Sequence, residues 1–446
     1  MPDKDLVKNF LPVIDKWLKF QTYSKEIPSV SVGIYFEDEV LFTNSYGYAN
    51  LEEKKLATPQ TMYRIASHSK LFTSTIIMKL YENGLLSIDD KVSKYLPWLP
   101  LETGEIRIRH LLTHSSGLTR DSRFGQWFHN NFPSKDDFIK AVNDENKIFE
   151  PNSFFKYSNI GFTLLGFIIE TVTSQSFDQN ITNLTKELNL QNTISDYSDE
   201  FIENHAIGYS RKLPHEPRTA FPQVPANSMS SATGLSSTVN DLLKFYQAHF
   251  LGNNKLFSDT YKRDMQQIHY VDSKKGIKWG FGFSHMNISK IPFIGHGGGY
   301  PGFITRSGFN QDKNLILVVL TNAIDGPALD LFNGIADLIY FALSNKDKFI
   351  SKNKFPLANN FQGFYKNDWR IMYLQKVKDM YLLVNPLLPT ISQSINILEQ
   401  SSEHSFILPE GTGFDNAGEE LLLLEKDGRC TIQQAGENLE QFEFTI

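Results

Sequence analysis

Residues 63–73 read YRIASHSKLFT and place Ser67 three residues before Lys70. Side chains three residues apart lie on the same face of a helix, so a hydroxyl and an amine meet here about one turn apart. Serine alone is a poor nucleophile, and a neighbouring amine, or a base polarised by one, is a known way to activate it. At a helix N-terminus, free backbone N–H groups can also stabilise a developing oxyanion. The stretch therefore suggests nucleophilic catalysis by Ser67.

The S-x-x-K spacing alone is a weak signal, because it occurs three times in the chain. The pair that begins at Ser351 lies in a basic segment, and the pair that begins at Ser153 lies in a predicted loop. Only Ser67 stands at the head of a long apolar helix, which we expect to end at Asn83 and Gly84. Position in the predicted fold therefore favours Ser67.

A tyrosine and an asparagine directly precede the apolar stretch 160–172, which has the length of a helix. They are Tyr157 and Asn159, one of four Y-x-N spacings in the chain. The loop before a buried helix can direct a phenol and an amide into a cleft. A nearby lysine ammonium lowers the pKa of a phenol, so Tyr157 is a candidate general base.

Residues 295–302 read GHGGGYPG and allow three functional interpretations besides a plain glycine bulge. Gly297, Gly299 and Gly302 match a dinucleotide fingerprint, but strands are predicted after it and Pro301 lies inside it. The oxyanion loop of lipases requires a later G-x-S-x-G motif, which the chain lacks. We favour the third interpretation, a glycine-rich strand edge that lets a substrate lie against the backbone with an N–H aimed at the reacting oxygen.

The sequence predicts neither a metal site nor a cofactor. His110 and His114 are four residues apart, but no glutamate follows His110, so the zinc-protease pattern fails. Cys430 is the only cysteine, which excludes an internal disulfide and a cysteine-rich zinc site. Ser115 and Ser116 are expected to be exposed loop serines.

Composition indicates an ordinary soluble globular protein, with 41% hydrophobic and 21% charged residues. The net charge of −6 favours neither nucleic acid nor an anionic membrane as a partner. The aliphatic run 315–320 is too short to span a bilayer, and residues 1–20 show no signal peptide. We expect a cytoplasmic protein, or a periplasmic or secreted one if a leading segment has been removed.

Hydrophobic periodicity predicts an α/β chain with two domains. A hairpin is expected from strands 29–35 and 40–46. The other predicted elements of the first domain are helices 4–21, 67–83, 135 onward, 160–172, 238–250 and 328–343, and strands 281–285, 292–295, 303–309 and 315–321. We place this domain at 1–345 and a basic linker at 346–358.

The last part of the chain, 359–446, is predicted to be an all-β module, either a sandwich or a barrel. Its expected strands are short and separated by turns: 361–365, 370–375, 380–384, 406–408, 420–424 and 441–446.

Three motifs in order, S-H-S-K at 67–70, Y-S-N at 157–159 and H-G-G at 296–298, resemble those of the serine β-lactamase/penicillin-binding protein superfamily. The closer resemblance is to the peptidase S12-like branch, which holds class C β-lactamases, D-alanyl-D-alanine carboxypeptidases, D-amino-acid peptidases and β-lactamase-like esterases. LLTHSSGL at 111–118 and SATGLSS at 231–237 also look like family landmarks. The resemblance covers about residues 5 to 345.

The resemblance implies a catalytic domain with an antiparallel sheet flanked by helices, a helical subdomain, and the site between them. It makes Ser67 the acylated nucleophile, Lys70 its activating neighbour, and Tyr157 the general base and leaving-group acid. Whether Lys70 or Tyr157 takes the serine proton is left open by the sequence. The final module resembles lipocalin-like C-terminal domains, expected to shape substrate access or to mediate homo-oligomer assembly.

The resemblance also implies substrate contacts and an oxyanion hole. Asn159, His296 and Gly298 would bind the substrate, and the backbone N–H groups of Ser67 and Gly299 would hold the oxyanion. The departure from the family pattern is His296, since β-lactamases and penicillin-binding proteins usually carry lysine there. Histidine is mostly neutral near pH 7 at its ordinary pKa of about 6.5, which weakens binding of a substrate carboxylate.

The leading hypothesis is a serine hydrolase that forms an acyl-enzyme on Ser67 and cleaves small esters, amides or peptides, including peptides with D-residues. A β-lactamase or D-alanyl-D-alanine carboxypeptidase is the alternative within the enzymes. A catalytically silent scaffold that binds or assembles is the alternative of another class.

Overall fold

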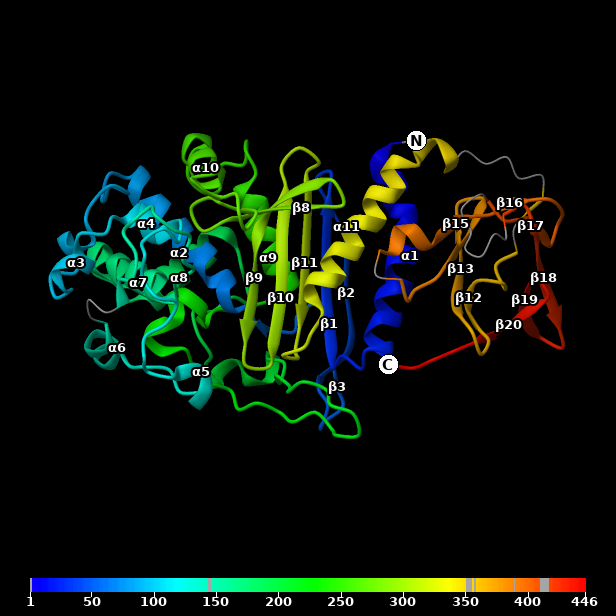
Figure 1. The fold of residues 1–446 in the computed structure, drawn as a ribbon, viewed down its shortest axis with the longest axis horizontal. Helices are drawn as coiled ribbons and strands as arrows, with labels where there is room; N and C mark the ends of the chain where they lie inside the picture. Colours follow the sequence, from blue (N-terminus) through cyan, green and yellow to red (C-terminus); the bar gives the residue numbers. More distant parts are fainter. Residues whose placement is uncertain (1, 143–145, 350–354, 357, 389, 410–416) are drawn as a thin grey trace. The chain divides into compact units, whose positions relative to one another are not determined.

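The computed structural model describes residues 2–142, 146–349, 355–356, 358–388, 390–409 and 417–446. The chain forms two compact units (Figure 1). The larger unit comprises Ile27–Asn287 and Pro292–Phe332. The smaller unit combines both ends of the chain, Met1–Glu26 and Asn333–Ile446, with the short segment Ile288–Ile291.

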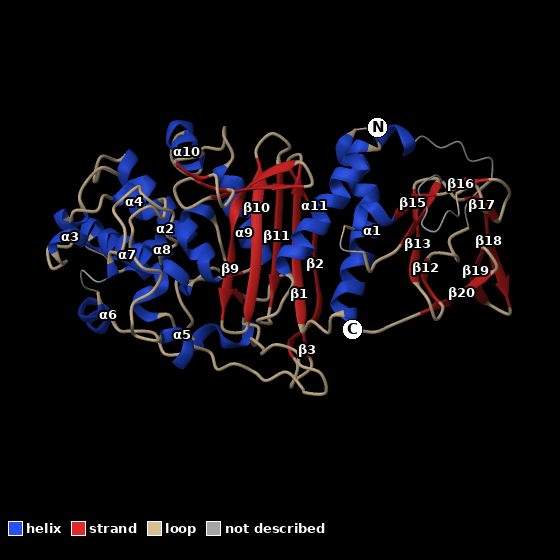
Figure 2. Cartoon of the chain, in the orientation of Figure 1, coloured by secondary structure: helices blue, strands red, loops and turns tan. Residues whose placement is uncertain are grey.

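A nine-stranded antiparallel sheet forms the centre of the larger unit, as Figure 2 shows in red. The predicted hairpin is confirmed: β1 (Ser29–Phe36) pairs with β2 (Glu39–Asn50). On its other side β1 pairs with β11 (Leu315–Thr321), so strands nearly 300 residues apart are neighbours. The order is β3-β2-β1-β11-β10-β9-β8-β7-β6. The remaining strands are β3 (Lys55–Leu56), β6 (Tyr270–Asp272), β7 (Ile277–Trp279), β8 (Ser284–Ile288), β9 (Ile291–Tyr300) and β10 (Phe303–Asn310).

Helix α9 (Val239–His249) packs against two neighbouring inner strands, β1 and β11. Its first turn is capped as predicted, because the Thr238 hydroxyl accepts a hydrogen bond from the backbone N–H of Asp241. Close packing requires a small residue on β1, since a Cβ at Gly33 would lie 3.0 Å from the Leu243 side chain. Every residue of β1 and β11 is buried, which explains the continuous apolar run of β11.

The helical part of the larger unit is organised around α2 (Ser69–Glu82) and α7 (Asn159–Thr173). A short π-helix, η6 (Ser230–Gly234), packs against both of them. The two-residue strands β4 (Tyr63–Arg64) and β5 (Ser236–Ser237) pair, which ties the segment before α2 to the segment after η6. The other helices are α3 (Leu101–Gly104), α4 (Ile108–Leu112), α5 (Gln126–His129), α6 (Lys135–Ala141), α8 (Phe177–Leu188) and α10 (Asp259–Gln266).

Within the described ranges, no single helix has the length and apolar composition needed to span a membrane. Helices α7 and α8 reach that length and composition together, but the chain bends by 82° between them. The first eleven residues of α7 are buried inside the larger unit, as expected for a core helix.

The smaller unit contains a nearly closed β-barrel, which decides between the predicted sandwich and barrel. Its order is β15-β14-β13-β12-β20-β19-β18-β17-β16, and only Leu398 separates the two end strands in sequence. The unit also contains α1 (Asp3–Ser24) and most of α11 (Ala328–Ser344). The barrel strands are β12 (Gly363–Lys366), β13 (Ile371–Val377), β14 (Met380–Val384), β15 (Ile395–Ile397), β16 (Glu399–Gln400), β17 (Ser405–Ile407), β18 (Glu420–Lys426), β19 (Arg429–Gln434) and β20 (Glu437–Phe442).

The predicted linker at 346–358 begins as a 3-10 helix over Lys346–Phe349. Residues 350–354 and 357 lie outside the described part of the chain. The boundary drawn from the sequence at residue 345 stays a prediction.

Candidate active site

Ser67 lies in a single turn of 3-10 helix, Ala66–His68, that leads directly into α2. The residue before it has a left-handed backbone, with φ of +51° at Ala66, which is uncommon for a residue other than glycine. Two hydrogen bonds hold the turn: the Ser69 hydroxyl donates to the Ala66 carbonyl and accepts from the backbone N–H of Leu235. Ser67 itself is half-buried, whereas both of its neighbours are buried. Its hydroxyl is therefore the accessible group of a rigid turn.

Lys70 is fully buried one turn beyond Ser67, and its amine has three polar neighbours. Nζ lies 2.8 Å from Asn159 Oδ1 and 2.7 Å from the Ala232 carbonyl oxygen of η6. Both of these atoms can only accept hydrogen bonds. The third neighbour is the Ser67 hydroxyl, with Oγ at 3.3 Å from Nζ. A neutral amine has two N–H donors and one lone pair, so this arrangement leaves the lone pair for Ser67.

Burial lowers the pKa of Lys70 well below its ordinary value. The Asp121 carboxylate opposes this shift, and the Arg120 guanidinium adds to it. The free amine is therefore accessible at lower pH than in an exposed lysine, which is what a general base requires.

Tyr157 lies beside this pair, with Lys70 Nζ 4.8 Å from the centre of its ring. Its phenol is hydrogen-bonded to the Ser67 side chain. The prediction that its pKa is lowered by a lysine ammonium is wrong. Burial raises the pKa of Tyr157, and the buried lysine is itself shifted toward its uncharged form. Tyr157 is therefore held as a protonated phenol, which suits a proton donor.

Asn159 is buried at the start of α7, and both ends of its amide are bound within the protein. Its oxygen accepts from Lys70, and its Nδ2 donates to Asp121 Oδ1 at 2.9 Å. Asp121 Oδ1 also accepts from Gln126 Nε2 at 3.0 Å. The structure thus gives Asn159 a role beside Lys70 in addition to the substrate contact expected from the sequence.

The predicted glycine-rich strand edge is the second half of β9. Pro301 and Gly302 form the turn to β10, and Tyr300 pairs with Phe303 at its closing position. Hydrogen-bonded and non-hydrogen-bonded pairs alternate along an antiparallel ladder. The pair that closes the two-residue turn is hydrogen-bonded, so the next pair, Gly299 with Ile304, is not, and the Gly299 N–H is directed away from β10. Five-residue β8 faces only the first half of β9. The Gly299 N–H is thereby available to a bound oxyanion.

Gly298 brings β9 against the nucleophile turn. A Cβ at this position would lie 2.4 Å from the Ile65 carbonyl oxygen and 2.4 Å from Thr305 Oγ1. It would also lie 3.1 Å from the Ala66 Cβ. The absence of a side chain at Gly298 therefore sets how closely the two predicted oxyanion donors can approach.

His296 is buried, and its Nδ1 lies within hydrogen-bond distance of the Gly297 carbonyl oxygen. A carbonyl can only accept, so Nδ1 carries the proton and Nε2 presents a lone pair. Burial lowers the pKa of His296 well below 6.5, with further lowering from His68 and Lys70. The neutral histidine inferred from the sequence is the form that this environment favours.

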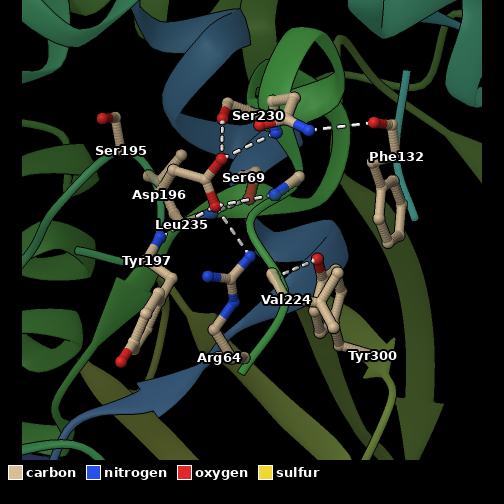
Figure 3. A network of polar contacts seen from close by, with 12 residues as sticks. Arg64, Ser69, Phe132, Ser195, Asp196, Tyr197, Val224, Ser230, Leu235 and Tyr300 are labelled. Carbon is tan, nitrogen blue, oxygen red and sulfur yellow. Dashed lines mark hydrogen bonds and ion pairs between the residues drawn. The ribbon is translucent and has the colours of Figure 1, made fainter. Parts of the chain in front are cut away.

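Buried Arg64 and half-buried Asp196 form an ion pair, as Figure 3 shows. Arg64 Nη2 lies 2.8 Å from Asp196 Oδ1, and its guanidinium carbon lies 4.4 Å from the centre of the Tyr300 ring. Asp196 Oδ2 also accepts from the Ser230 hydroxyl of η6 at 2.9 Å. The network therefore joins the strand before Ser67, the end of β9, and the π-helix that carries Ala232.

Three residues of the site were not found from the sequence: Arg120, Asp121 and Trp279. The first two lie two and three residues after the end of the 111–118 landmark, which is the only local signal for them. The Trp279 ring contacts His296, with ring centres 5.5 Å apart, and Tyr157, at 6.1 Å. These residues approach the nucleophile only in space.

Other local predictions have mixed outcomes. His110 is hydrogen-bonded to the Asn152 side chain, and His114 accepts a hydrogen bond from the Ser158 N–H. Within the described ranges, no group of three metal-ligating side chains occurs. Ser115 and Ser116 are fully buried, which corrects their expected exposure. The Ser115 hydroxyl donates a hydrogen bond to Asn152 Oδ1, and the Ser116 hydroxyl accepts one from the Leu118 N–H. Both hydrogen bonds stabilise the turn in the landmark.

Sequence comparison identifies curated relatives that share part of this chain. "Protein flp" of Staphylococcus aureus strain N315 is 29% identical over 319 residues, 69% of this chain and 62% of that protein. "Penicillin-binding protein 4*" of Bacillus subtilis strain 168 is 30% identical over 308 residues, 64% of this chain and 66% of that protein. The chain thus matches slightly less than two thirds of the length of either relative.

Solved structures with the same fold match between 75% and 97% of this chain. The octameric penicillin-binding protein homologue from Pyrococcus abyssi matches 97% of this chain and 100% of its own, with a TM-score of 0.66 and 21% identity. The D-amino acid amidase from Ochrobactrum anthropi SV3 matches 75% and 99%, with a TM-score of 0.65 and 20% identity. The hydrolase EstCE1 matches 76% and 99%, with a TM-score of 0.61 and 21% identity.

The family comparison agrees with the motifs and the fold. Residues 14–338 match the family described as beta-lactamase, which is well over half of the chain. This range includes every residue of the site described above. The chain therefore belongs to the beta-lactamase family, within the serine β-lactamase and penicillin-binding protein superfamily.

Proposed function

We propose that this protein is a serine hydrolase that forms an acyl-enzyme on Ser67 and cleaves small esters or amides. The observation that carries the proposal is the environment of the Lys70 amine. Its two N–H groups are directed to the Asn159 and Ala232 oxygens, and the remaining position faces Ser67 Oγ at 3.3 Å. This is the geometry of a general base beside its nucleophile.

In acylation, the Lys70 lone pair takes the Ser67 proton as Oγ attacks the substrate carbonyl carbon. The developing oxyanion is bound by the N–H groups of Ser67 and Gly299. As the bond to the leaving group breaks, the Tyr157 phenol gives its proton to the departing oxygen or nitrogen. The proton held on Lys70 then replaces the one that Tyr157 lost, so the protein returns to its starting charge.

In deacylation, water attacks the acyl carbon and its proton passes to Lys70. Collapse of the tetrahedral intermediate releases the acid, and Ser67 recovers a proton from Lys70. Apart from the substrate and this water, the proton transfers use only side chains of the protein.

The neutral His296 favours substrates without a carboxylate at this position. A lysine ammonium would attract the carboxylate of a β-lactam or of a D-alanyl-D-alanine peptide, whereas a neutral imidazole does so weakly. The amidase and the hydrolase EstCE1 among the structural matches are consistent with ester or amide cleavage.

Intact-mass measurement of a covalent adduct tests the proposal. The full-length protein is exposed separately to p-nitrophenyl esters, D-aminoacyl anilides and β-lactams, and its mass is recorded after rapid quenching. We expect an acyl adduct and a p-nitrophenol burst with the esters, and both are lost in Ser67→Ala. Ser153→Ala, from a competing S-x-x-K spacing, is the control and is expected to react normally.

Two outcomes would overturn the proposal. Adduct formation that persists in Ser67→Ala would place the nucleophile elsewhere. No adduct with any compound, together with a large defined oligomer on sizing, would support the silent scaffold. Rapid turnover of a chromogenic cephalosporin would instead support the β-lactamase alternative.

A further inference from the structure

We propose that Asp121 is a positioning residue that fixes the orientation of the Asn159 amide and, with its neighbour Arg120, sets the charge that surrounds Lys70. The inference rests on the proposed function, because it concerns the base that activates Ser67. It assigns a task to two residues that no sequence motif had marked.

The first step of the argument is the orientation of the amide. Asp121 Oδ1 is an acceptor 2.9 Å from Asn159 Nδ2, so it holds the NH₂ group of Asn159 on the side away from Lys70. Gln126 Nε2 donates to the same oxygen at 3.0 Å and helps to fix the carboxylate. The carboxylate therefore directs Asn159 Oδ1 toward the amine.

The second step is what a reversed amide would do. An Asn159 NH₂ group facing Lys70 would donate to the lone pair of the neutral amine. That lone pair is the position needed for the Ser67 proton. Asp121 thus acts on the nucleophile through two side chains, without touching it.

The third step is the charge around Lys70. Asp121 and Arg120 are adjacent in sequence, and Arg120 Nε lies 3.4 Å from Asp121 Oδ2. The Arg120 guanidinium carbon also lies 5.5 Å from the centre of the Tyr157 ring. The carboxylate raises the pKa of Lys70, and the guanidinium lowers it.

The remaining titratable groups near Lys70 are kept uncharged at neutral pH. Burial lowers the pKa of His68 to about 4 and moves the pKa values of His114 and His296 well below 6.5. Burial also raises the pKa of Tyr157. Arg120 and Asp121 are therefore the charged groups of this environment, and substituting one or the other can raise or lower the pKa of Lys70.

The test is the pH profile of kcat/KM for a p-nitrophenyl ester. If the reaction needs neutral Lys70, activity falls on the acid side as Lys70 is protonated. Asp121→Asn removes a charge that raises the pKa of Lys70, so the acid limb should move to lower pH. Arg120→Gln removes a charge that lowers it, so the limb should move to higher pH. We expect shifts of at least about half a unit, and near cancellation in the double variant.

A second readout separates orientation from charge. Asp121→Leu removes the acceptor as well as the charge, so the Asn159 amide can rotate. We expect kcat at the pH optimum to fall by about 10- to 100-fold, whereas Asp121→Asn, which keeps an acceptor oxygen, stays within a few-fold of the parent protein.

Matched controls exclude a general effect of charge. Arg263 is 63% exposed and lies beside Asp259, as Arg120 is 65% exposed and lies beside Asp121. Arg263→Gln and the exposed-turn variant Asp312→Asn should leave the profile unchanged. Circular dichroism and thermal melting check that each variant is folded.

The outcomes distinguish this inference from the function on which it rests. Equal shifts in the same direction for Asp121→Asn and Arg120→Gln, or no shift in either, would overturn the inference if Ser67 still forms the adduct. If the unaltered protein forms no adduct on Ser67, the proposed function itself is overturned instead.

Discussion

Single residues in this site are constrained by what surrounds them more than by their own chemistry. Gly298 is the clearest case, because any side chain would collide with the Ile65 carbonyl oxygen and with Thr305. Its Cα passes next to the turn that carries the nucleophile. The distance between the two oxyanion donors therefore depends on a residue that is not itself one of the donors.

Gly298→Ala should lower kcat/KM for an activated ester by about 100-fold, the cost of losing one oxyanion donor. The added methyl group has to push β9 away from Ile65 and Ala66, which moves the Gly299 N–H out of position. Gly161→Ala is the control, since a Cβ there would make only ordinary contacts, 3.4 Å from Leu111. Steady-state kinetics of both variants make the comparison, and full activity in Gly298→Ala would show that the approach of β9 is not limiting.

At the scale of elements, three short segments hold the site together: the β4–β5 pair, the π-helix η6, and the end of β9. None of them is a long regular element, yet each carries or adjoins a group used by the site. The Arg64–Asp196 pair connects all three, with Arg64 1% exposed and Asp196 18% exposed. We infer that this ion pair stabilises the frame on which Ser67, Lys70 and Gly299 are mounted.

Asp196→Ala should lower the free energy of unfolding by about 3 kcal/mol, because it leaves the buried Arg64 charge without its partner. Glu105→Ala is the matched control, since it breaks the exposed Lys91–Glu105 pair, with side chains about half exposed. That change should cost less than about 1 kcal/mol. Urea titration followed by circular dichroism measures both. Similar losses in the two variants would mean that the buried pair contributes no more than a surface one.

At the scale of the whole molecule, the smaller unit combines the first helix of the chain with the last strands. Phe20 of α1 stacks on Phe364 of β12, with ring centres 5.5 Å apart. Gln21 Nε2 donates to the Pro386 carbonyl at 2.7 Å, and the Tyr373 hydroxyl donates to the Val13 carbonyl at 3.2 Å. Helix α1 is therefore part of the packing of the barrel unit.

Phe20→Ala should increase hydrogen exchange both in α1 and in barrel peptides more than 340 residues away, such as those covering β12 and β20. Loss of a buried aromatic ring costs about 3 to 5 kcal/mol, and this loss falls on the unit that contains the ring. The control is Phe72→Ala, which removes the stacked contact with Phe245 in the larger unit. Its effect should appear in α2 and α9. Exchange confined to α1 in Phe20→Ala would contradict the shared packing.

The sequence predicted the regular parts of the fold because they have strong periodic patterns. The β1–β2 hairpin, β10, β11, α7, α9 and α11 all agree in type and approximate position. The strands that it missed are short or half polar. They include β7, with three residues, and β19, which buries only alternate residues, Cys430, Ile432 and Gln434.

The sequence predicted the site residues that belong to motifs. It did not predict those that lie outside the motifs and come close to them only in the folded chain. Ser67, Lys70 and Tyr157 lie together as the motifs suggested. Asp121 and the Ala232 carbonyl could not be found, because a single acidic residue and a backbone oxygen have no sequence signature. The direction of the Tyr157 pKa was wrong for a related reason, since burial is a property of the folded chain.

The smaller unit is built from segments far apart in the sequence, and this affects its folding during synthesis on the ribosome. Helix α1 emerges well before its partners, because the aromatic residues against which it packs begin about 340 residues later. At roughly 5 to 20 residues per second, its apolar face waits about 20 to 70 seconds for its partners. During that time the nascent helix offers a hydrophobic surface to chaperones, and a chain released early leaves it without a binding site.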